Sequence, residues 1–122
     1  MLMKFLSALV FACGVQAAAA QDLPPLACEG REGNWTLTIV GPAAQLTLGD
    51  VFELQVAQET RPENSPWPIV QTLVGNRQTA ISLVTQRLCS SHFVTSYPFE
   101  ITLLTQRGET PLVLTGCCTL AE

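Results

Sequence analysis

From residue 34 onward, apolar and polar residues alternate with the two-residue period of β-strands. In residues 34–40, Trp35, Leu37 and Ile39 share one face, which predicts a half-buried strand with Trp35 toward the core. Further strands are predicted at 44–48, 51–58, 69–74, 79–88, 99–105 and 112–117, with Phe52, Leu54 and Val56 on one face of the third, and Ala80, Val84 and Leu88 on one face of the fifth. Nothing after residue 20 keeps a helical period for three turns, so the predicted fold is all-β.

Turn residues separate these runs at regular spacing. Gly41-Pro42, Gly49-Asp50, Gly75-Asn76 and the segment around Gly108 each end a strand, and residues 59–68 carry three prolines and are predicted to form a loop. Residues 21–26 contain two prolines and are predicted to be an extended lead-in. Short strands in this arrangement indicate a small antiparallel barrel or sandwich of about seven or eight strands, and closure into a barrel would remove exposed strand edges.

The N-terminus has the pattern of a signal peptide. Lys4 precedes an apolar run from Phe5 to Ala12, and four alanines end at Ala20, which predicts a signal helix over residues 1–20 and a single domain over 21–122. The apolar run is too short to span a bilayer. We therefore expect export to the periplasm with no transmembrane segment in the mature chain. A loose lipobox ending at Cys13 gives the alternative of a lipid-anchored protein.

Charge narrows the range of partners. Without residues 1–20 the chain has no lysine and carries five arginines against ten acidic residues. This balance argues against nucleic acids and anionic membranes as partners, since both are bound through clustered positive charge. It is compatible with a basic protein partner.

Four cysteines remain in the predicted mature chain, namely Cys28, Cys89, Cys117 and Cys118. An even number in an exported chain indicates two disulfides. Adjacent residues do not easily reach disulfide geometry, so the two remaining pairings both join Cys28 and Cys89 to the C-terminal pair. Adjacent strand residues point to opposite faces, which predicts one bridge on each side of the last strand.

The same residues permit an alternative in which the protein handles a metal. Cys89 and His92 have C-x2-H spacing, and Cys117 and Cys118 would add two thiolates. His92 also follows Ser90 and Ser91, but no nucleophile elbow or orienting acid accompanies them. We expect no enzyme activity and no cofactor.

The spacing of Trp35, Cys89-Ser90, Tyr97-Pro98 and Gly116-Cys117-Cys118 resembles a family of uncharacterised bacterial exported proteins and lipoproteins. Members typically read C-S-D-G-M-S-D-x-x-Y-P in the middle and G-C-C near the end. This chain keeps the G-C-C and the ends of the middle motif, but not its two acidic residues. The resemblance implies a small exported barrel, similar in look to the membrane-bound inhibitors of c-type lysozyme and to META-type domains.

These observations suggest a non-catalytic binding module of the bacterial envelope, which would contact a protein partner or a small ligand through loops at one barrel end. The expected loops are Glu59–Pro68 and Ser90–Ser96, with Trp67, His92 and Tyr97 as candidate binding residues. Trp67 has an alternative role, in which it folds back to cover one end of the core. Lysozyme inhibition is the most specific form of the hypothesis, because an acidic barrel is complementary in charge to a basic enzyme.

Overall fold

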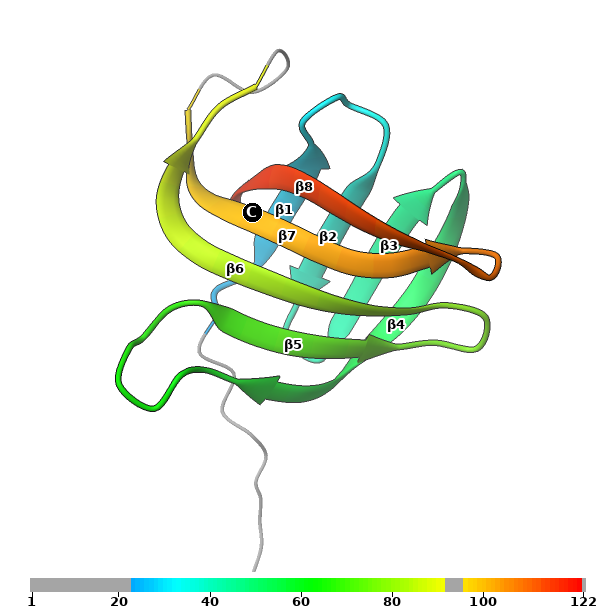
Figure 1. Ribbon diagram of the computed structural model, residues 1–122, viewed down its shortest axis with the longest axis horizontal. Helices are drawn as coiled ribbons and strands as arrows, with labels where there is room; N and C mark the ends of the chain where they lie inside the picture. Colours follow the sequence, from blue (N-terminus) through cyan, green and yellow to red (C-terminus); the bar gives the residue numbers. More distant parts are fainter. Residues whose placement is uncertain (1–22, 92–95, 122) are drawn as a thin grey trace, which may run out of the picture.

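The computed structural model describes residues 23–91 and 96–121, which form a closed antiparallel barrel (Figure 1). Each strand pairs with the next one along the chain, and the last strand pairs with the first. The all-β prediction is confirmed, in its barrel form. The predicted signal peptide and Cys13 lie outside the described residues. The strands are β1 (Leu26–Gly30), β2 (Thr36–Val40), β3 (Ala43–Leu48), β4 (Asp50–Thr60), β5 (Ile69–Val74), β6 (Thr79–Cys89), β7 (Tyr97–Arg107) and β8 (Thr110–Leu120).

Strand β1 was not expected from the sequence, which predicted an extended lead-in up to residue 26. Leu26, Cys28 and Gly30 are buried and alternate with more exposed neighbours. The strand pairs with β2 on one side and β8 on the other, so its backbone hydrogen bonds close the barrel. Its extended conformation depends on these two distant partners, because the segment has no local run of β-branched or aromatic residues.

The interior is filled by the inward residues of all eight strands. Leu37, Leu46 and Ile101 are fully buried, and further leucines, isoleucines and alanines complete the core together with Val84 and Phe99. The alternation predicted for β2 and β4 therefore corresponds to the inner and outer faces of one barrel. Within the described residues, no helix is long and apolar enough to cross a membrane.

Trp35 is only 3% exposed and fills the space above two glycines. Gly30 and Gly116 are direct partners in the β1–β8 ladder. A methyl group on Gly116 would overlap the carbonyl oxygen of Glu29 and lie 3.0 Å from the Trp35 ring. The predicted core position of Trp35 is confirmed, and the absence of a side chain at Gly30 and at Gly116 is what makes room for it.

Strand β6 departs from simple alternation near its end. Ala80 and Val84 are buried, as residues of one face should be, but Leu88 is 78% exposed. The β6–β7 register shifts between Gln86 and Cys89, which turns Leu88 away from the core and Cys89 into a buried position. The predicted common face of Ala80, Val84 and Leu88 is wrong at Leu88 for this reason.

Sequential antiparallel pairing gives the barrel two distinct ends. The chain leaves β2, β4 and β6 at one end, which we call the loop end, and this end holds residues 61–68 and, among the described residues, Ser90 and Ser91 after β6. The connections after β3, β5 and β7 lie at the other end, which we call the turn end. The β1–β2 connection lies beside the start of the β6–β7 loop, where Arg31 contacts Ser90. In Figure 1 the β4–β5 connection and the end of β6 are at the left, and the β5–β6 and β7–β8 turns are at the right.

Candidate binding surfaces at the two ends of the barrel

The disulfides pair Cys28 with Cys118 and Cys89 with Cys117. Cys28 and Cys118 belong to the barrel core, whereas Cys89 and Cys117 form a separate buried cluster with Tyr97 beside it. One bridge therefore lies on each side of β8, as predicted, and the structure decides between the two pairings. Two disulfides belong to an oxidising environment outside the cytoplasm.

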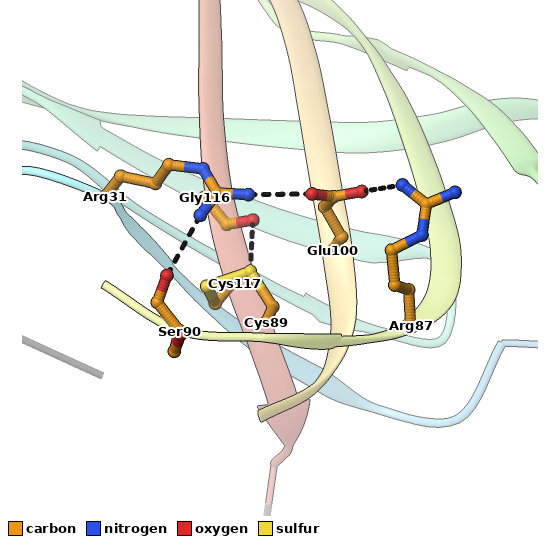
Figure 2. A network of polar contacts seen from close by, with 7 residues as sticks. All are labelled: Arg31, Arg87, Cys89, Ser90, Glu100, Gly116 and Cys117. Atoms are coloured by element: carbon orange, nitrogen blue, oxygen red, sulfur yellow. Dashed lines mark hydrogen bonds and ion pairs between the residues drawn. A yellow bond between two sulfur atoms is a disulfide. The ribbon is translucent and has the colours of Figure 1, made fainter. Parts of the chain in front are cut away.

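The Cys89–Cys117 bridge fastens the end of β6 to β8, and an arginine reinforces this attachment (Figure 2). The Cys89 sulfur, which carries no proton in the disulfide, lies 3.3 Å from the Gly116 carbonyl oxygen. Arg31 donates one hydrogen bond of 3.0 Å to the Ser90 carbonyl and another of 2.7 Å to the Glu100 carboxylate. The first residue of the β6–β7 loop is thus held from two sides.

Glu100 shares its carboxylate between two arginines. Arg31 binds one oxygen, and Arg87 binds the other, each at 2.7 Å. Figure 2 shows the three side chains in a row, with Glu100 on β7 between the arginines. The Arg87 side chain is 65% exposed, so solvent weakens its pair, while the Arg31 pair is better shielded. The row ties β7 to the β1–β2 connection and to β6.

Tyr97, a predicted binding residue, lies at the start of β7 and packs against the Cys89–Cys117 bridge. Its hydroxyl donates a hydrogen bond of 3.2 Å to the Glu29 carboxylate. Burial raises the pKa of Tyr97 above its usual value, and the negative charge of Glu29 and its hydrogen bond act in the same direction. Tyr97 is therefore a neutral hydrogen-bond donor on the outer face, beside the β6–β7 loop.

Trp67 covers the core at the loop end, which confirms the second of the two roles predicted for it. Its ring is half-buried, packs against the core and has its centroid 5.9 Å from that of Phe99. The Ser65 hydroxyl donates a hydrogen bond of 2.9 Å to the Trp67 carbonyl, and the Trp67–Pro68 peptide bond is cis. Trp67 thus fixes the loop of residues 61–68 against the barrel.

The oxidised protein offers few ligands for the metal site that the sequence allowed as an alternative. His92 lies outside the described residues. Cys89, Cys117 and Cys118 are all joined in disulfides, and a disulfide sulfur offers no thiolate to a metal ion. In the part of the chain that the structure describes, no group of three or more His, Cys, Asp or Glu side chains is arranged to hold a metal. The metal-handling alternative requires reduced protein.

A row of polar side chains crosses the inner face near the loop end. Glu59, Gln71 and Ser82 are direct ladder partners on β4, β5 and β6. The Gln71 amide donates a hydrogen bond of 2.8 Å to the Glu59 carboxylate, and Arg61 lies 3.8 Å from the other carboxylate oxygen. Gln71 Oε1 and Ser82 Oγ are buried with no hydrogen-bond partner among the described residues.

The turn end contains an opening that the sequence did not reveal. It has a volume of about 270 Å³ and is lined by residues of three connections, among them Phe52, Arg77 and Arg107. The Arg77 guanidinium lies 5.1 Å from the centre of the Phe52 ring. Each arginine follows or precedes a turn in the sequence, but only the up-and-down order of strands brings these turns to one end.

No family model, curated protein or solved structure matches this chain. The resemblance to exported lipoproteins therefore stays a prediction, together with the relatives that it implies.

Proposed function

We propose that the protein is a non-catalytic binding module of the periplasm, which contacts a protein partner or a small ligand through its loop end. One observation carries this proposal: both predicted binding loops leave the barrel at the same end, and each is anchored at its base. Trp67 anchors residues 61–68 on Phe99. The Cys89–Cys117 bridge and Arg31 anchor the chain that follows β6.

Anchored loops on a rigid barrel are suited to binding for a thermodynamic reason. A loop that is already held in place loses less conformational entropy when a partner orders it, so more of the contact energy remains as affinity. Binding residues are found disproportionately on loops that a stable scaffold positions. The two disulfides and the closed ladder supply such a scaffold in an oxidising compartment.

The charge of the protein favours a basic partner. Residues 21–122 hold ten acidic side chains and five arginines, and opposite net charge accelerates association and selects against acidic partners. A c-type lysozyme is the first basic enzyme to test. The lysozyme inhibitors that the resemblance brings in place a basic and a hydroxyl residue in the enzyme cleft. Because this chain has no lysine after residue 20, an arginine would have to supply the basic group here.

A photo-crosslinking experiment in periplasmic extract tests the role of the loop end. A photoreactive residue replaces Asn64 in the 61–68 loop or, as the matched control, Asn76 at the turn end, since both are exposed asparagines in connections. We expect a discrete adduct from position 64 and none from position 76. The same adducts from both positions, or none from position 64, would contradict the protein-partner form of the proposal.

A turbidity assay tests the lysozyme form of the proposal separately. Purified oxidised protein is added in excess to a c-type lysozyme acting on bacterial cell walls. Slower clearing identifies the enzyme as a partner, and unchanged clearing removes lysozyme from consideration.

A further inference from the structure

Two of the five arginines in residues 21–122 are set apart from the others by their surroundings. Arg31 and Arg87 both bind Glu100, and Arg61 lies 3.8 Å from Glu59. Arg77 and Arg107 have no ion pair within the described residues, and both line the same opening at the turn end. In a chain with twice as many acidic residues as arginines, two unpaired guanidinium groups at one opening are a departure from the general charge balance.

The opening combines an apolar floor with a charged rim. Leu48 is buried and Phe52 packs against the barrel core, and both line the opening with apolar side chains. Arg77, Arg107 and Asp50 are exposed at the rim. The rim therefore carries two positive charges and one negative charge, in a molecule whose overall charge is negative.

The positive rim is partly ordered before any ligand arrives. Arg77 is stacked over the Phe52 ring at 5.1 Å, an attractive arrangement that restricts its side chain. The neighbouring Gln78 is buried. Its side-chain amide donates one hydrogen bond of 2.8 Å to Thr105 Oγ1 and another to the Gln106 backbone carbonyl. The Gly75 backbone amide donates a hydrogen bond of 2.9 Å to the Gln78 backbone carbonyl, and this bond closes the turn that carries Arg77.

We propose that this opening binds a small amphiphilic anion, with its oxyanion head between Arg77 and Arg107 and its apolar tail on Phe52 and Leu48. The planar guanidinium group is the side chain best suited to carboxylate and phosphate oxygens, because its donors match their geometry. The volume of about 270 Å³ lies near the lower limit for ligand pockets, so the ligand is of fragment size. This site lies at the opposite end from the loops and is independent of their role.

The first test is a titration of isotopically labelled, oxidised protein followed by NMR, with octanoate as the probe. An anion of this size should bind with a Kd of roughly 1 mM and shift the amide signals of Phe52, Gln78 and Gly108. Octanol at equal concentration is the control for the tail alone and should bind at least about 5-fold more weakly, because it lacks the charge that the arginines recognise. Octyl phosphate is titrated in parallel, and whichever anion binds more tightly identifies the preferred head group.

Charge variants then separate the rim from the rest of the surface. Arg77→Gln and Arg107→Gln should each weaken octanoate binding by about 10-fold, the usual effect of removing a hydrogen bond to a charged group. Asp50→Asn should tighten octanoate binding by a few-fold, because it removes a negative charge from the lining of the opening. Arg87→Gln removes an equal charge from the outer face and should leave binding unchanged.

Three results would overturn the proposal. One is equal binding by octanol and octanoate, and another is unchanged affinity in both Arg77→Gln and Arg107→Gln. The third is the absence of saturable shifts at the turn end with either anion.

Discussion

At the scale of single residues, Ser82 is an unusual member of the barrel interior. Its side chain is fully buried, and its hydroxyl has no partner among the described residues. A buried hydroxyl that makes no hydrogen bond destabilises the folded state by about 1–3 kcal/mol, because it has lost its bond to water.

We therefore expect Ser82→Ala to raise the free energy of unfolding by about 1 kcal/mol. Val84→Ala, two residues along the same inner face, should lower it by about 1–3 kcal/mol through loss of buried apolar volume. Urea denaturation of both variants measures the two changes in the free energy of unfolding, which should have opposite signs. A loss of stability in Ser82→Ala would mean that a bound water completes the row.

Tyr97 makes the stability of the folded protein vary with pH in the alkaline range. The folded state raises the pKa of Tyr97 above the unfolded value of about 10, so the folded state holds the phenolic proton more tightly. The contribution of this group is complete below pH 10 and is lost as the pH rises through the folded pKa. Tyr97 is the only tyrosine in the chain, so the ultraviolet absorbance of phenolate reports it alone.

Glu29→Gln should lower the pKa of Tyr97 toward its usual value without reaching it, since burial is the largest cause of the shift. Tyr97→Phe should lower the stability at neutral pH by about 1 kcal/mol and reduce the loss of stability above pH 10. An unchanged phenolate titration in Glu29→Gln would contradict the assigned role of the Tyr97–Glu29 contact.

At the scale of elements, the Cys89–Cys117 bridge holds the end of β6 against β8. Its loop spans 28 residues, for which chain-entropy estimates give about 3.5 kcal/mol of stabilisation. Leu88 is already exposed, so release of this bridge should open the segment around it to chymotrypsin.

The double variant Cys89→Ser/Cys117→Ser should show faster amide exchange at residues 88–91 and 97–100, with β2 and β3 little changed. Proteolysis should begin near Leu88. Arg31→Gln, which loses only the contacts to Ser90 and Glu100, serves as the milder control and should lower stability by about 1 kcal/mol or less. Uniformly faster exchange throughout the barrel would show that the bridge acts globally instead.

At the scale of the whole molecule, the Cys28–Cys118 bridge joins the two strands whose pairing closes the barrel. It spans 90 residues, and the same chain-entropy estimate gives about 4.5 kcal/mol of stabilisation. Cys28→Ser/Cys118→Ser should therefore lose about 1 kcal/mol more stability than Cys89→Ser/Cys117→Ser in urea denaturation. We expect β1 and β8 to exchange first in this variant, and an equal or smaller loss would contradict the loop-length argument.

The sequence by itself determined the features that depend on neighbouring residues. The two-residue period predicted β2, β4 and most of the other strands, and it placed Trp35 in the core, because strand side chains alternate between faces wherever the strand lies. The same alternation placed one disulfide on each side of β8. Turn positions followed from glycine and proline, whose backbone preferences are local.

Only the tertiary structure decided the features that join distant parts of the chain. Strand β1 exists because β2 and β8 pair with it, and the choice of Cys28–Cys118 over the other pairing depends on that ladder. The exposure of Leu88 follows from a register shift between β6 and β7. Arg77 and Arg107 meet at one opening because barrel closure brings their turns to the same end, and no pattern of neighbouring residues encodes that distance.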